Sequence, residues 1–223
     1  RWESDAQHAG DPLDRLDLTR AYLQASDRVQ HETASAAVTT LTPIREDNPR
    51  LHWKAASGGD EVLMATWTSW PGYNGLVGQA TTTGVETWVT AVPEVHDFCA
   101  SQILIEPELR LEELLGLPPG NGKQFVVELW VHPADMFRPS ADPDITTTTS
   151  GLDFPATVSP DYVTWFNTTR AALYGPHGYP WTRLGYTYDW ANPAKPVGLS
   201  EFVIRKAAPV EVNSASTNAQ YCP

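Results

Sequence analysis

Gln124-Phe-Val-Val-Glu-Leu-Trp-Val-His132 is the most strand-like stretch of this chain. β-Branched and aromatic residues dominate it, and neither Gly nor Pro interrupts it, which is typical of a buried strand. We therefore expect a central strand of a sheet at 124–132.

Further strand-like runs lie on both sides of this stretch. The run 61–70 ends at the turn signal Pro71-Gly72, and the run 85–92 ends at Pro93. Three more strands are expected in the C-terminal part of the chain, at 183–190, 198–204 and 208–213. A tight turn at 205–207 is predicted to join the last two.

Apolar residues at helical spacing separate these strands. Pro12 and Ser159-Pro160-Asp161 are typical helix starts. Helices are expected at 12–31, 94–104, 109–115 and 159–173. Between them, residues 133–160 are rich in Pro, Asp and Thr and lack periodicity, which predicts a long loop.

This order of elements predicts an α+β fold. We expect residues 12–223 to form a single domain after an extended N-terminal lead-in, 1–11. Its sheet should be mixed but mainly antiparallel, and flanked by three to four helices and long Pro/Thr-rich loops.

The charge balance excludes several classes of partner. The 223 residues include 27 acidic and 15 basic side chains, which gives a net charge of −12. Nucleic acids and anionic membranes require clustered basic residues, and here they are scattered. No apolar run is long enough to span a membrane. The prediction is therefore an acidic protein with no nucleic-acid partner and no membrane span.

The two cysteines, Cys99 and Cys222, are too few for a thiolate metal site and form no C-x-x-C motif. We expect a disulfide between them; two separate thiols are the alternative. A disulfide together with the abundance of Thr and Ser favours a secreted or periplasmic protein. The start at Arg1 suggests a processed or trimmed chain. No motif requires a cofactor.

One candidate site follows from the central strand. Glu128, Trp130 and His132 share a face because side chains alternate along a strand. With Asp135 and the nearby loop carboxylates, His132 suggests a metal site, and Glu128 with His132 suggests an acid–base pair. The alternative is structural: the Asp residues form turns beside Pro, and His132 closes the strand.

A second candidate is the aromatic segment 179–190. Aromatic faces suit sugar rings and planar ligands, whereas most strand aromatics lie in a core. Trp70 and Tyr73, on a turn, are the expected second wall. The candidate ligand-binding residues are Trp70, Tyr73, Trp130, Trp181, Arg183, Tyr186, Tyr188 and Trp190.

The third candidate is Glu201, at the entry to a strand, followed by a turn and the short strand 209–212. This pattern, with 88–94 as a strand that runs into a helix, resembles in part the ADP-ribosyltransferase-like domains. The resemblance covers under a quarter of the chain and implies that Glu201 contacts a nicotinamide ribose. The sequence departs from the family pattern because 61–70 has no Arg or His and position 199 is Leu.

Three functional hypotheses follow. The first is an extracytoplasmic domain that binds a neutral saccharide-like or planar small molecule or glycan at an aromatic-lined site. The second is a carboxylate-dependent hydrolase or transferase, glycosidase-like or ADP-ribosyltransferase-like, with Glu201 and either Glu128 or Asp189 as catalytic residues. The third is a structural or protein–protein interaction protein whose exposed aromatics and long loop contact another protein or a second copy of itself.

Overall fold

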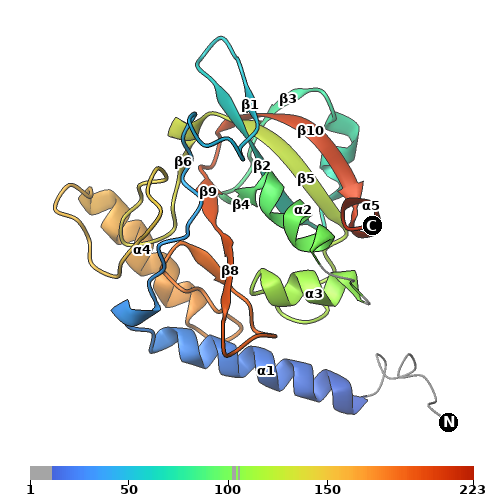
Figure 1. Ribbon diagram of the computed structural model, residues 1–223, viewed down its shortest axis with the longest axis vertical. Helices are drawn as coiled ribbons and strands as arrows, with labels where there is room; N and C mark the ends of the chain where they lie inside the picture. Colours follow the sequence, from blue (N-terminus) through green and yellow to red (C-terminus); the bar gives the residue numbers. More distant parts are fainter. Residues whose placement is uncertain (1–11, 102–103, 105) are drawn as a thin grey trace.

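The structure, a computed structural model, describes residues 12–101, 104 and 106–223 (Figure 1). The lead-in expected at 1–11 lies outside these residues. The helices are α1 (Pro12–Gln30), α2 (Val92–Ala100), α3 (Pro107–Leu114), α4 (Pro160–Leu173) and α5 (Asn218–Tyr221). Three 3₁₀ turns accompany them, η2 (Ala34–Ala36), η3 (Pro71–Leu76) and η4 (Pro133–Asp135).

The fold is built on a large antiparallel sheet. Its strand order is β3-β10-β5-β2-β4-β9-β6, with β1 paired to β2, and a second sheet consists of β7 and β8. The strands are β1 (Trp53–Lys54), β2 (Glu61–Thr68), β3 (Ala80–Thr82), β4 (Thr87–Ala91), β5 (Phe125–Val131), β6 (Met136–Phe137), β7 (Tyr186–Tyr188), β8 (Val197–Ser200), β9 (Phe202–Ile204) and β10 (Pro209–Thr217). The predicted α+β class is confirmed, and the stretch 124–132 is an interior strand, β5.

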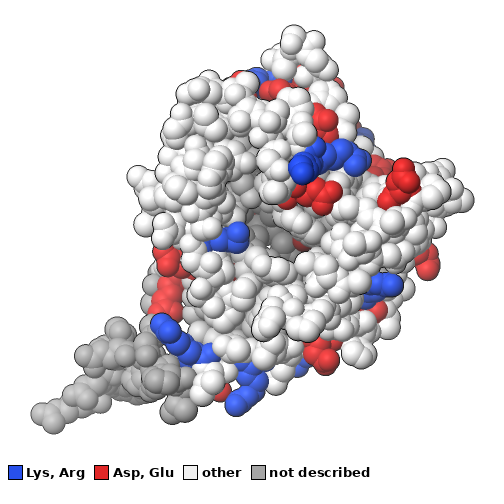
Figure 2. All heavy atoms as spheres, turned by 180° about the vertical axis from the view of Figure 1, so that it is seen from behind, with Lys and Arg blue, Asp and Glu red and all other residues white. Residues whose placement is uncertain are grey.

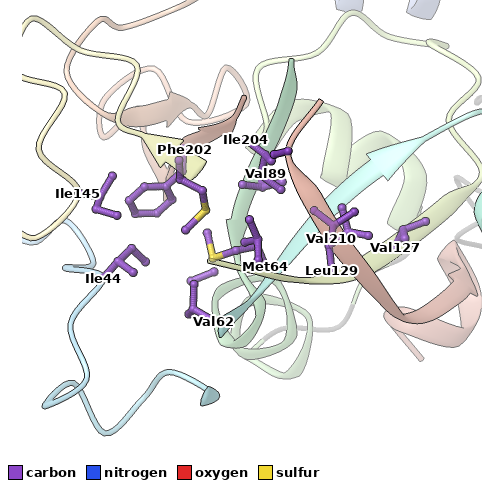
Figure 3. Close-up of a cluster of buried hydrophobic side chains, with 14 of the residues drawn as sticks. Ile44, Val62, Met64, Val89, Val127, Leu129, Ile145, Phe202, Ile204 and Val210 are labelled. Carbon is purple, nitrogen blue, oxygen red and sulfur yellow. The ribbon is translucent and has the colours of Figure 1, made fainter. Parts of the chain in front are cut away.

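The alternation of side chains along β2 and β5 explains why one face of this sheet is a core. Val62 pairs with Val131 and Met64 with Leu129, and all four are buried. Figure 3 shows Val62, Met64 and Leu129 with residues of β4, β9 and β10 and with Ile44 and Ile145 of two loops. Each such side chain stabilises the fold by about 1.5–3 kcal/mol when removed from water.

The opposite face carries Leu63 and Trp67 of β2, against which α2 and α3 pack through Val95 and Leu111. The predicted pairing of Cys99 with Cys222 is present, with a Cα–Cα distance of 5.2 Å. It joins α2 to the end of α5, so that the C-terminal segment lies over β5 and β10 (Figure 1).

The C-terminal part differs from the prediction in its details. The strand expected at 183–190 is shortened to Tyr186–Tyr188, since Arg183 and Gly185 have positive φ angles of 62° and 79° that bend the chain. The run expected at 198–204 is divided into β8 and β9, which belong to different sheets. A tight turn follows as expected, but β9 pairs with β4 and β6 whereas β10 pairs with β3 and β5.

Candidate functional site

The division of the predicted strand 198–204 places Glu201 at a junction between the two sheets. Glu201 is the single residue between β8, which pairs with β7, and β9, which pairs with β4. Its backbone N–H donates to the carbonyl of Gly185 at 3.0 Å, and the N–H of the preceding Ser200 donates to the Glu94 carboxylate at 2.8 Å. The backbone around Glu201 is therefore fixed from both sides.

A cavity of about 400 Å³ lies where the two sheets separate. It is enclosed by the face of the large sheet that carries Trp67, by α3 and by the segment 179–188. Figure 2 shows a hollow near the centre of the face opposite to that of Figure 1, bordered mostly by uncharged side chains. The aromatic side chains that line the cavity are those of Trp67, Trp88, Tyr179, Trp181 and Tyr188.

The strand register builds the floor of this cavity. Ala65 of β2 pairs with Thr90 of β4, and Val89 pairs with Phe202 of β9. The next residues in the second register are Thr90 and Glu201, so Ala65, Thr90 and Glu201 form a row across three strands, and all three line the cavity. Because alternate residues share a face, Trp67 and Trp88 follow on the same side as this row.

Glu201 is the most unusual group of the cavity. The side chain is only 6% exposed, and its Oε1 has no hydrogen-bond partner among the described residues. Burial raises the pKa of Glu201 well above its usual range, while Trp181 and the positive charge of Arg138 partly oppose this rise. The carboxyl is therefore held toward its neutral form, which both donates and accepts a hydrogen bond.

Arg138 is a buried residue whose positive charge acts on Glu201. Its side chain is fully buried and donates to the carbonyls of Thr42, Asp144, Ile145 and Thr147. Burial lowers the pKa of Arg138 to about 10, and nearby carboxylates, including Glu201, oppose the shift.

Gly185 makes room for the stem of Arg138. A Cβ on this glycine would lie 2.7 Å from Cδ of Arg138, which is closer than side-chain atoms approach. Glycine at this position therefore allows both the positive φ angle and the contact with Arg138, and its carbonyl receives the N–H of Glu201.

Lys123 lines the same cavity from the segment that precedes β5. Its N–H donates to Oδ1 of Asn121 and its carbonyl accepts from Nδ2 of Asn218, which fixes the backbone. The side chain is half-buried, and this burial lowers the pKa of Lys123 below its usual value. Among the described residues, no carboxylate forms an ion pair with its ammonium group.

Of the ligand-binding residues expected from the sequence, Trp181 and Tyr188 line the cavity. The others lie elsewhere. Trp70 is 54% exposed and packs edge-on against Tyr73, on the far side of the sheet core. Trp130 contacts Asn213 and Lys54, and Tyr186 and Trp190 belong to other clusters. Arg183 donates to the carbonyl of Val29 and holds α1.

The two further carboxylates proposed as catalytic, Glu128 and Asp189, do not line the cavity with Glu201. Glu128 accepts hydrogen bonds from Asn213 and Ser214 at 2.7 and 2.9 Å and from Tyr221 at 3.1 Å. Both oxygens of Asp189 accept from Arg110, at 2.9 and 2.5 Å. Their oxygens are thus occupied by structural contacts.

His132 and Asp135, the proposed metal ligands, lie at the two ends of a short 3₁₀ turn. Nδ1 of His132 accepts from the N–H of Ala134 at 3.1 Å, and the imidazole packs against Gly59. No cluster of three or more His, Cys, Asp or Glu side chains that could hold a metal ion occurs among the residues that the structure describes.

Sequence reasoning missed Trp67, Trp88, Thr90 and Lys123. The first three lie on strands that were expected, but only the pairing of β2, β4 and β9 brings them to one face. Lys123 had one signal: it is one of only four lysines, and it stands at the entry to the strongest strand. That signal does not indicate which way the side chain points.

None of the helices in the described part of the chain is long and apolar enough to cross a membrane.

Comparison of the chain with protein-family models, with curated proteins and with solved structures found no match.

Proposed function

We propose that this protein binds a small planar or saccharide-like ligand in the cavity above Glu201. The observation that carries the proposal is the buried Oε1 of Glu201, which has no partner among the described residues and belongs to a side chain that lines an aromatic cavity. A buried polar atom without a partner costs about 1–3 kcal/mol. A ligand hydroxyl or amide placed against Glu201 would remove that cost.

The size and lining of the cavity support this class of ligand. Its volume, about 400 Å³, lies in the range of small-molecule sites. Trp67, Trp88 and Trp181 offer faces and edges for a ring, and Thr90 lies beside Glu201 as a second polar group. The ligand would thus be held by stacking on its ring and by hydrogen bonds at one edge.

A location outside the cytoplasm remains part of the proposal. Its support is the disulfide between Cys99 and Cys222, because such bonds persist in oxidising compartments.

Binding is tested by ligand-observed NMR and calorimetry with glucose, maltose, nicotinamide and adenosine as probes. For a probe that binds, Glu201→Leu should weaken binding roughly 10-fold or more, whereas Glu201→Gln, which keeps hydrogen-bonding atoms, should retain most of it. Trp88→Ala should also weaken binding, and Trp70→Ala, at an exposed aromatic outside the cavity, is the matched control. An equal loss of affinity in Trp88→Ala and Trp70→Ala would refute the site.

A second candidate is an enzyme of the ADP-ribosyltransferase-like type. The observation that favours it is the position of 88–94: this strand-to-helix segment lies directly beside the strand that follows Glu201, and Thr90 and Glu201 line the same cavity. In this reaction the bond between the nicotinamide nitrogen and the ribose carbon breaks, and its electron pair leaves with nicotinamide. Water adds to the ribose carbon and releases one proton. The cationic nicotinamide ring would favour the ionised form of Glu201.

Incubation with NAD and measurement of free nicotinamide distinguishes the two candidates. If the protein is such an enzyme, the wild type releases nicotinamide. Glu201→Gln then abolishes this release and retains the thermal unfolding transition. Binding of NAD or nicotinamide without release would leave only the binding function.

A further inference from the structure

Lys123, which precedes β5, and Glu201, which precedes β9, both line the cavity. Phe125, two residues after Lys123, pairs with Thr68 of β2, whereas the row that contains Glu201 crosses β2 at Ala65. Thr68 and Ala65 are three residues apart, which corresponds to about 10 Å along a strand. Lys123 lies beyond that pair, and β2 and β4 separate β5 from β9, so Lys123 and Glu201 are apart both along the strands and across the sheet.

Among the described residues that line the cavity, Lys123 is the one basic residue. Glu86, the other carboxylate of the lining, accepts a hydrogen bond from Nε1 of Trp165 at 2.9 Å. Glu112, close in sequence to the Lys123 segment, accepts from the N–H groups of Gly120 and Asn121, both at 2.9 Å. Both acids are thus engaged elsewhere, and Lys123 has no carboxylate partner among the described residues.

We infer that Lys123 binds an anionic group, a phosphate or a carboxylate, on the same ring ligand whose other end meets Glu201. This inference rests on the proposed function and names its ligand class: a ring compound that carries an anionic group.

The energetics agree with this assignment. Partial burial of an ammonium group without a counter-ion is unfavourable, which is why the pKa of Lys123 is lowered. An anion beside it would reverse that effect. The rest of the protein, with its net charge of −12, repels anions, so the attraction must be local to Lys123.

The test compares neutral and anionic probes with the same ring. The two sets are adenosine, adenosine 5′-monophosphate and adenosine 5′-carboxylate, and glucose, glucose 6-phosphate and glucuronate. Calorimetry is carried out on the wild type, on Lys123→Met and Lys123→Arg, and on Lys195→Met as a control at an exposed lysine.

We expect an anionic probe to bind the wild type roughly 10-fold or more tighter than its neutral counterpart, as for a charge-assisted hydrogen bond. Lys123→Met should remove this difference and leave the affinity for the neutral probe within about three-fold. Lys123→Arg should keep part of the preference for the anionic probe, and Lys195→Met should keep all of it. Preference for the phosphate or for the carboxylate identifies the anion.

Two results would overturn the inference. If neutral and anionic probes bind the wild type equally, or if the preference persists in Lys123→Met, Lys123 does not bind the anion. When neutral probes still bind in a manner that depends on Glu201, the proposed function stands and only this inference fails. Absence of binding by every probe, with either ring, refutes both.

Discussion

At the scale of single residues, the buried carboxyl of Glu201 links the site to the stability of the protein. Its usual pKa is 4.5, and the pKa in the folded protein is well above that value. At pH values between these two pKa values, Glu201 keeps its proton in the folded state and has lost it in the unfolded state. The stabilising contribution of Glu201 is therefore complete below pH 4.5 and is lost as the pH rises through the folded pKa.

Glu201→Gln removes this dependence, because the amide does not titrate. We expect the melting temperature of the variant, relative to the wild type, to increase from about pH 4 to about pH 8. Each pKa unit of separation corresponds to about 1.4 kcal/mol, or about 3–6 °C in a protein of this size. Thermal unfolding measured at several pH values tests this, with Glu46→Gln at an exposed position as control. A constant difference across the range would contradict the protonated state of Glu201.

Arg138 is the second residue with a strong predicted effect. Its guanidinium satisfies carbonyls of the loop 138–150 and of Thr42, so Arg138→Met would leave buried acceptors without donors. We expect a loss of about 3 kcal/mol or more in the free energy of unfolding. Denaturant unfolding measures it, and Arg20→Met, at an exposed ion pair, should cost under about 1 kcal/mol. Similar losses in both variants would show that the burial of Arg138 contributes no stability.

At the scale of elements, the disulfide between α2 and the C-terminal segment closes a loop with a sequence separation of 123. The chain-entropy account gives about 4–5 kcal/mol for such a loop. Cys99→Ser/Cys222→Ser should lower the free energy of unfolding by this order, and the wild type in reductant should match the double variant. Mass measurement shows whether the reductant has broken the disulfide. If the bond is lost and the stability of the wild type does not change, the disulfide does not make this contribution.

The elements also show what was predictable from the sequence. The strand 124–132 and the run from 61 were found because alternating β-branched and aromatic side chains are a local signal. The strand expected at 183–190 was too long because its apolar pattern hides the bends at Arg183 and Gly185. The change of sheet at Glu201 was missed because it depends on the pairing of β9 with β4, which is distant in the sequence.

The residues of the site also divide into those that the local sequence indicates and those that depend on strand pairing. Glu201, Trp181 and Tyr188 were candidates on local grounds, and all three line the cavity. Trp67, Trp88 and Lys123 were not, because their side chains meet only after β2, β4 and β5 have paired. Residues that share an element were thus easier to find than residues brought together by strand register.

At the scale of the whole molecule, the last strand of the chain is an interior strand of the sheet. β10 lies between β3 and β5, so a chain that ends at residue 208 would leave β3 without its partner and one edge of β5 unpaired. We expect this truncation to abolish cooperative unfolding. A chain that ends at residue 217 keeps β10 and loses only α5 and the disulfide, and should retain a transition at lower temperature. Calorimetry of both chains tests the prediction, and a cooperative transition in the shorter one would contradict it.

The position of β10 has a consequence for the order in which the molecule forms. During synthesis, β2, β4 and β5 emerge well before their partners β9 and β10, so the sheet can close only when the chain is almost complete. Pairings between segments so far apart in sequence are associated with folding in milliseconds to seconds. The cavity wall at Glu201 therefore forms in the same late step as the sheet, and a nascent chain holds no binding site.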